Sequence, residues 1–141
     1  MFPRVLLLTV VLALGLAPGQ TRPAAVEGAG GDAARGRRLF ATLPCASCHD
    51  VEKPWPGGDI CPNLGNIATE AARIVRRPDY RGRAKDAAGY IRESILDPNA
   101  YVVPGASYRQ PDGRSVMPAD FGRTLAPAAL DDLVAFLLTL R

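Results

Sequence analysis

The chain has 141 residues and a formal net charge of +3, so it has room for one compact domain and little besides. Seventeen Lys and Arg and fourteen Asp and Glu are spread along the sequence without a polybasic tail, which excludes the electrostatic pattern of a nucleic-acid-binding protein. Fourteen Gly, thirteen Pro and nine aromatic residues predict short elements, ordered loops and a core that needs additional support.

The N-terminus has the pattern of an export segment. Arg4 precedes an apolar run over residues 5–17, which is shorter than the 18 or more residues of a typical membrane span. We therefore expect residues 1–19 to be a cleaved export signal, or else an uncleaved anchor that tethers the protein through its apolar run. Either outcome predicts a periplasmic protein or one on the outer face of the cytoplasmic membrane. Residues 20–31 are rich in Gly, Pro and Ala and predict a flexible linker, which leaves 32–141 for the folded domain.

Apolar periodicity predicts four helices and no sheet. The first begins at Asp32, an acceptable N-cap residue, and ends before Pro44. The other three are expected at residues 68–76, 86–96 and 127–140. Residues 97–125 contain four prolines and predict a long loop that something must hold in place.

Residues 45–49, Cys-Ala-Ser-Cys-His, form the CxxCH pattern of covalent haem c attachment. Two thiols at this spacing can each add to one of the two vinyl groups on the porphyrin edge, and the His that follows is placed to bind the iron. Cys45 and Cys48 are therefore predicted to hold the haem, with His49 as an axial ligand. One covalent haem would also supply apolar bulk that a core with few aromatic residues lacks.

The same five residues could serve a purpose other than haem attachment. A dithiol redox pair usually follows a strand, whereas the residues before Cys45 favour a helix. A zinc site made of Cys45, Cys48, His49 and Cys61 would force two adjacent residues into one tetrahedron. The third possibility is a chance occurrence of the pattern without any cofactor.

The second axial ligand is predicted from the small number of candidates. His49 is the only His in the chain, and Met1 lies in the export segment, which leaves Met117 as the one thioether available to the folded domain. Coordination by Met117 would hold the 97–125 loop and would raise the potential of the iron relative to harder ligands. If Met117 were an ordinary packing residue, the iron would be five-coordinate or would bind Lys, Cys61 or an outside ligand.

The order of these features resembles the class I c-type cytochromes over about residues 31–141. The features are Gly36 and Phe40 in the first helix, the CxxCH motif, Pro62-Asn63-Leu64, the stretch Ile95 to Asn99, Met117-Pro118 and the last helix. The resemblance implies an all-α cytochrome c fold, with three to five short helices packed around one covalent haem. It also implies that the first and last helices cross closely, with Gly36 at the crossing and Phe40 against Phe136 or Leu133.

Three further residues matter for this resemblance. It implies that the carbonyl of Pro62 accepts a hydrogen bond from a ring nitrogen of His49 and so fixes its tautomer. Cys61 stands where the family usually has Gly, and it can be a buried small residue, a partner in an intermolecular disulfide or a redox-active thiol. Ala126 is a poor cap and leaves the start of the last helix in question.

The leading hypothesis is one-electron transfer in a respiratory or related chain, with no residue assigned to catalysis. Between positions 73 and 85 the sequence has six basic residues and one acidic residue, Asp79. This excess of positive charge predicts either a docking face for an acidic redox partner or a solvated helix face. The first alternative is a haem subunit fixed in a membrane redox complex. The second is a sensor or peroxidase in which Met117 is displaced by NO, CO or peroxide.

Overall fold

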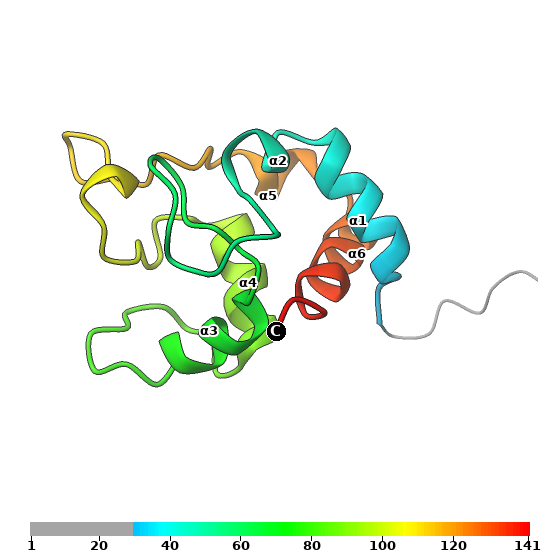
Figure 1. Ribbon diagram of the computed structural model, residues 1–141, viewed down its shortest axis with the longest axis horizontal. Coiled ribbons are helices and arrows are strands. Elements are labelled where there is room, and N and C mark those ends of the chain that lie inside the picture. Colours follow the sequence, from blue (N-terminus) through cyan, green and yellow to red (C-terminus); the bar gives the residue numbers. More distant parts are fainter. Residues whose placement is uncertain (1–29) are drawn as a thin grey trace, which may run out of the picture.

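The computed structural model describes residues 30–141, and this part of the chain is helical without a β-strand. Its helices are α1 (Ala33–Thr42), α2 (Cys45–Cys48), α3 (Ile67–Ile74), α4 (Ala87–Leu96), the 3-10 helix η1 (Ala106–Tyr108), α5 (Phe121–Thr124) and α6 (Pro127–Leu137) (Figure 1). None of the helices within 30–141 is long and apolar enough to cross a membrane. The predicted export segment and nearly all of the predicted linker lie outside the described residues.

The all-α prediction is confirmed, and the four predicted helices correspond to α1, α3, α4 and α6. Two single-turn helices are added to them, so six α-helices stand where three to five were expected. The additional helices α2 and α5 have four residues each, which is too short to produce a readable periodicity.

The last helix differs from the prediction at its C-terminal end, because it stops at Leu137 instead of continuing to the C-terminus. It begins at Pro127, and Ala126 provides no side-chain cap. The missing cap is tolerable because Pro has no N–H to satisfy in the first turn.

Helices α1 and α6 cross in contact with one another (Figure 1). Gly36 lies at the crossing, where a Cβ atom would come within 1.9 Å of the Asp132 carbonyl oxygen. The rings of Phe40 and Phe136 meet beside it, with their centroids 5.7 Å apart. Both details agree with the crossing that the resemblance implies. The absence of a side chain at Gly36 therefore sets how closely the two helices approach.

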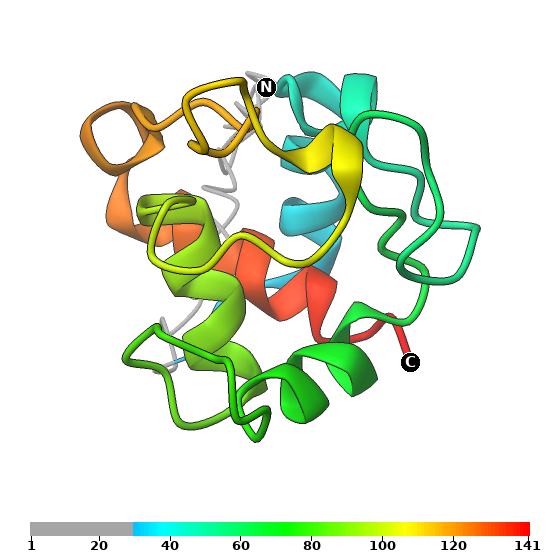
Figure 2. The same ribbon diagram turned by 90° about the vertical axis from the view of Figure 1, so that its left-hand side faces the viewer.

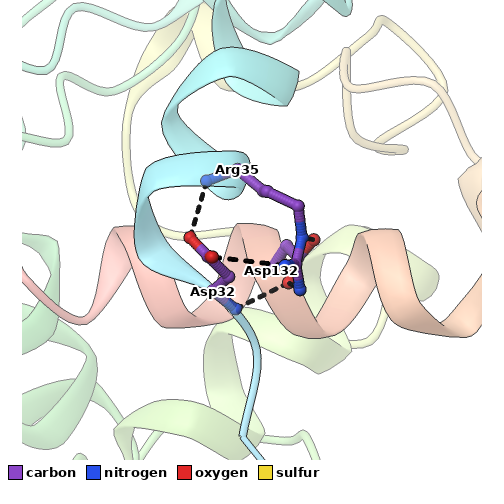
Figure 3. A network of polar contacts seen from close by, with 3 residues as sticks. All are labelled: Asp32, Arg35 and Asp132. Atoms are coloured by element: carbon purple, nitrogen blue, oxygen red, sulfur yellow. Dashed lines mark hydrogen bonds and ion pairs between the residues drawn. The ribbon is translucent and has the colours of Figure 1, made fainter. Parts of the chain in front are cut away.

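A buried carboxylate fastens the same two helices to one another. Asp132 of α6 is 5% exposed, and its Oδ1 accepts hydrogen bonds from the Asp32 backbone N–H at 2.6 Å and from Arg35 Nη2 at 3.0 Å (Figure 3). Its Oδ2 accepts a third bond from Arg35 Nε at 2.8 Å. Asp32 in turn caps α1 by accepting from the Arg35 backbone N–H at 2.9 Å, as expected for an N-cap residue. The start of α1 is thus tied to the middle of α6.

The core lies between α1, α4 and α6, which surround the centre of the molecule, while the segment that joins α4 to α5 passes in front of them in Figure 2. Helix α4 contributes Ile91 and Ile95, and α6 contributes Leu133 and Leu137. These apolar side chains, with Phe40 of α1, form the walls of the space described next.

Candidate haem-binding site

The CxxCH motif forms a single helical turn immediately after α1. Helix α2 begins after Pro44 and ends at Cys48, and the backbone N–H of the next residue, His49, donates to the Cys45 carbonyl at 2.9 Å. Cys45 is half-buried and Cys48 is exposed. Because residues three apart share one face of a helix, this turn presents both thiols on the same side. Since a helix and not a strand precedes the motif, a dithiol redox pair lacks its usual structural context.

His49 follows the turn in an extended conformation and its ring is partly buried. Nδ1 lies 2.7 Å from the carbonyl oxygen of Pro62. A carbonyl can only accept, so Nδ1 donates, and Nε2 is left with the lone pair that could bind a metal. Burial lowers the pKa of His49, although the hydrogen bond to Pro62 opposes that effect. The ring is therefore held in the neutral form and in the tautomer that an axial ligand requires.

Two adjoining cavities that open to solvent occupy the space next to His49, with about 740 Å³ and about 390 Å³ of empty space when the solvent at their mouths is included. Both are lined by His49, Met117, Leu64, Ile95 and Leu137. Both also have aromatic side chains in their walls, and the smaller one includes Cys45. The residues that line these two cavities include no Asp, Glu, Lys or Arg. The site is an apolar crevice with one imidazole, one thioether and one attachment thiol at its walls.

Met117 is positioned through two polar residues of the segment between α4 and α5. Its backbone N–H donates to Ser115 Oγ at 3.1 Å, and the Ser115 backbone N–H donates to Asn99 Oδ1 at 2.9 Å. Ser115 is buried. These bonds attach the Met117 loop to the end of α4, so part of what holds the long loop is polar and independent of any cofactor.

The sequence alone does not mark Ser115 and Asn99 as site residues. Asn99 belongs to a stretch that contributes to the family resemblance, but the pattern assigns it no role. A Ser two positions before Met117 is the one local signal, because Ser side chains often accept a backbone N–H two residues on. The partner of that Ser, sixteen residues away, is visible only in the folded chain.

The loop between α2 and α3 holds the third cysteine. Cys61 is 4% exposed and lines the larger cavity. Burial, together with the neighbouring Cys48 thiol, raises the pKa of Cys61 to about 12. A buried thiol with a raised pKa has little thiolate and reacts slowly, which favours the interpretation of Cys61 as a buried small residue over a disulfide partner or a reactive thiol.

The residues around the crevice fit a haem c group. The crevice is apolar, as a porphyrin ring requires, and its walls carry a neutral imidazole, a thioether and the Cys45 thiol. Cys48 lines neither cavity and is exposed, one turn of α2 away from Cys45. A zinc site gains no support, since nowhere in residues 30–141 do three or more His, Cys, Asp or Glu side chains gather as such a site would need.

Comparison with known proteins agrees with this chemistry. Residues 33–141 match the family model described as Cytochrome c. Neither a search of curated proteins nor a search of solved structures gives a match. The matched region begins at α1 and includes the whole crevice, so the family model and the site coincide. The chain belongs to the cytochrome c family, whose covalently bound haem c serves electron transfer.

Proposed function

We propose that the protein is a one-electron carrier of a respiratory or related electron-transport chain, with one haem c attached through Cys45 and Cys48 and ligated by His49 and Met117. The observation that carries this proposal is that His49 and Met117 both line the same two adjoining apolar cavities. When bound, the haem supplies an iron that changes between ferrous and ferric states. A Met/His ligand pair gives such an iron a comparatively high potential.

The residues around the crevice have separate tasks in this proposal. Pro62 orients the His49 ring, and Ser115 positions the Met117 backbone. The apolar walls exclude water, which also favours a raised potential. No Asp, Glu, Lys or Arg side chain lines the two cavities. This lining supports a carrier more than an enzyme, because apart from the proposed iron ligand His49 it offers neither a carboxylate nor a Lys to act as a general acid or base beside a substrate.

An optical spectrum of the purified protein tests the ligand set. Ferric haem with a methionine sulfur ligand has a weak absorption band near the red end of the visible spectrum. We expect this band at neutral pH, together with a low-spin ferrous spectrum that carbon monoxide changes only slowly. A ferric protein without the band at neutral pH would contradict ligation by Met117 and would favour the sensor or peroxidase alternative.

We further propose that the protein works outside the cytoplasm with redox protein partners, in the periplasm or on the outer face of the cytoplasmic membrane. The support is the pattern of the first 19 residues. Intact mass separates a free carrier from a haem subunit fixed in a membrane complex. A mature chain that begins near Gln20 favours the free carrier, whereas a chain that retains residues 5–17 favours the membrane-tethered subunit.

A further inference from the structure

The loop between α3 and α4, residues 75–86, carries a compact group of positive charges. Its exposed basic side chains are Arg76, Arg77, Arg81, Arg83 and Lys85. We call this segment the arginine loop. It lies at the bottom left in Figures 1 and 2, away from α2 at the top of both views, so it is on a different side of the molecule from the attachment turn.

Only part of this positive charge is neutralised within the domain. Arg77 Nε lies 2.9 Å from Asp79, whereas Arg83 Nε lies 3.8 Å from Glu93. Arg81 donates to two backbone carbonyls, at 2.9 Å and 3.3 Å, which orient its guanidinium without cancelling its charge. Arg76 and Lys85 make no ion pair in the described part of the chain. The loop therefore presents a net positive surface to solvent.

The arginine loop is fastened to α4 at its centre. The Tyr80 hydroxyl donates to the Glu93 carboxylate and accepts from the Ala84 backbone N–H at 3.1 Å. Glu93 also accepts from the Arg83 backbone N–H at 2.8 Å. A partner that binds this loop would therefore lose little conformational entropy in ordering it.

Tyrosine rings connect the loop to the wall of the crevice. The Tyr80 ring centroid is 6.1 Å from that of Tyr90 and 5.2 Å from that of Tyr101. Both Tyr90 and Tyr101 line the larger cavity. One layer of aromatic rings thus separates the positive surface from the proposed haem position.

We propose that the arginine loop is the docking surface for an acidic patch on a redox protein partner, and that electrons are exchanged there across the Tyr80–Tyr90–Tyr101 layer. This proposal rests on the proposed electron-carrier function. With haem bound, the exchange would move one electron between the haem and the partner's redox centre, so that one would be oxidised as the other was reduced, with no bond or proton changed. Complementary charge at such a surface increases the rate of encounter and fixes the orientation of the partners.

The loop is better suited to a protein than to an anionic membrane. Interfacial binding needs large apolar side chains that insert among the lipids, and the exposed large apolar residues of residues 30–141 are Ile60 and Leu96, neither of which belongs to the loop. Carboxylates also lie among its basic groups, at Asp79 and Asp86. A mixed surface of this kind pairs with the mixed polar rim of a protein interface.

A charge-reversal experiment tests the surface. The variant Arg76→Glu/Lys85→Glu changes two basic residues of the loop that make no ion pair in the described part of the chain. The control Arg37→Glu/Arg123→Glu makes the same change of net charge at exposed positions of α1 and α5. Poly-L-glutamate serves as the acidic probe and is titrated into the isotopically labelled reduced holoprotein at low ionic strength, with NMR shifts as the readout.

We expect the shifts to concentrate at residues 75–86 and to disappear in high salt. Binding should be about tenfold weaker in the Arg76→Glu/Lys85→Glu variant and near the wild-type value in the control. Shifts that concentrate on residues 45–49, or an equal loss of binding in both variants, would overturn the proposal. Tighter binding to phosphatidylglycerol vesicles than to poly-L-glutamate, lost in the same variant, would overturn it in favour of a membrane surface.

Oxidation by ferricyanide separates failure of the docking surface from failure of the carrier function. If the ferrous holoprotein is rapidly oxidised while the NMR titration fails, only the docking proposal is wrong. If one-electron reagents do not change the state of the haem at all, the carrier function itself is wrong, whatever the loop binds.

Discussion

At the scale of single residues, the proposed axial methionine has structural support from its neighbours. The Met117 backbone is attached through Ser115 to Asn99, while its side chain lines both cavities. Mutation can therefore separate ligation from loop position. A change at Met117 removes the sulfur, whereas a change at Ser115 removes the hydrogen bond that positions the Met117 backbone.

Met117→Ala should leave the haem covalently bound, because the thioethers to Cys45 and Cys48 do not depend on the axial ligand. We expect an open iron position and a lower reduction potential, measured by redox titration. Met117→Leu is the matched control, because it removes the sulfur but keeps most of the volume. If the leucine variant retains the wild-type potential and spectrum, Met117 is a packing residue and the ligand is another group.

Ser115→Ala should weaken the hold on Met117 without removing the sulfur. The lost hydrogen bond is worth about 1 kcal/mol, so we expect added imidazole to displace the methionine with an affinity several-fold higher than in the wild type. Ser107→Ala, an exposed position in η1, is the control and should bind imidazole as the wild type does. Ser115→Thr keeps the hydroxyl and should restore the wild-type affinity; a threonine variant that behaves like the alanine variant would refute the role of the hydroxyl.

Cys61→Ser should leave covalent attachment intact, since the motif thiols are Cys45 and Cys48. Intact mass and the spectrum of the haem under denaturing conditions measure this directly. A variant that loses its covalent haem would mean that Cys61, and not one of the motif cysteines, supplies an attachment thiol.

At the scale of elements, the contact between α1 and α6 is the part of the fold most sensitive to small changes. A Cβ atom at Gly36 would meet backbone atoms of Asp132, and backbone cannot move aside as a flexible side chain can. We expect Gly36→Ala to destabilise the domain by about 1–3 kcal/mol and to lower its melting temperature by several degrees. Gly30→Ala, where nothing lies within 4 Å, is the control, and an unchanged melting temperature for both would contradict a close crossing.

The buried carboxylate of the same contact predicts a dependence on pH. The hydrogen bonds from Arg35 and from the Asp32 backbone keep the pKa of Asp132 below its usual range, against the opposing effect of burial. A lowered pKa in the folded state contributes stability that is fully present above about pH 4, the unfolded value, and is lost as the pH falls through the folded value.

Asp132→Asn should therefore be less stable than the wild type at pH 7, and the difference should shrink as the pH falls below about 4. Asp131→Asn, on the same helix, removes an exposed pair with Arg92 and is expected to cost little. Urea unfolding at several pH values measures both variants. A difference between the wild type and Asp132→Asn that stays constant between about pH 7 and pH 3 would contradict the assigned role.

The elements show which parts of the fold can be predicted from sequence. Helices α1, α3, α4 and α6 have eight or more residues and carry apolar repeats, so their existence was predictable, although their ends differ by a few residues. Helices α2 and α5 are single turns held by hydrogen bonds to the carbonyls of Pro44 and Asp120. A single turn is too short to produce an apolar periodicity in the sequence, so neither helix could be predicted. The Asp132 network was also invisible, because it depends on a contact between residues about a hundred positions apart.

At the scale of the whole molecule, the attachment residues could be read from one short motif because the chemistry demands a fixed spacing. The crevice itself could not be read in this way. Its walls come from the loop after α2, from α4, from the Met117 loop and from α6, and only the fold brings these segments together. The arginine loop was recognisable as a basic stretch, but its attachment to the crevice through Tyr80 was not.

The bonds between Asp32 and Asp132 span a separation of 100 residues, and this has a consequence for biosynthesis. Synthesis runs from the N-terminus, so α1 and the CxxCH turn emerge long before α6 exists to close against them. Contacts that join distant parts of a chain form late. The contact between α1 and α6 is thus among the last to form, and both motif thiols are already part of the chain while the crevice still lacks the wall that α6 provides.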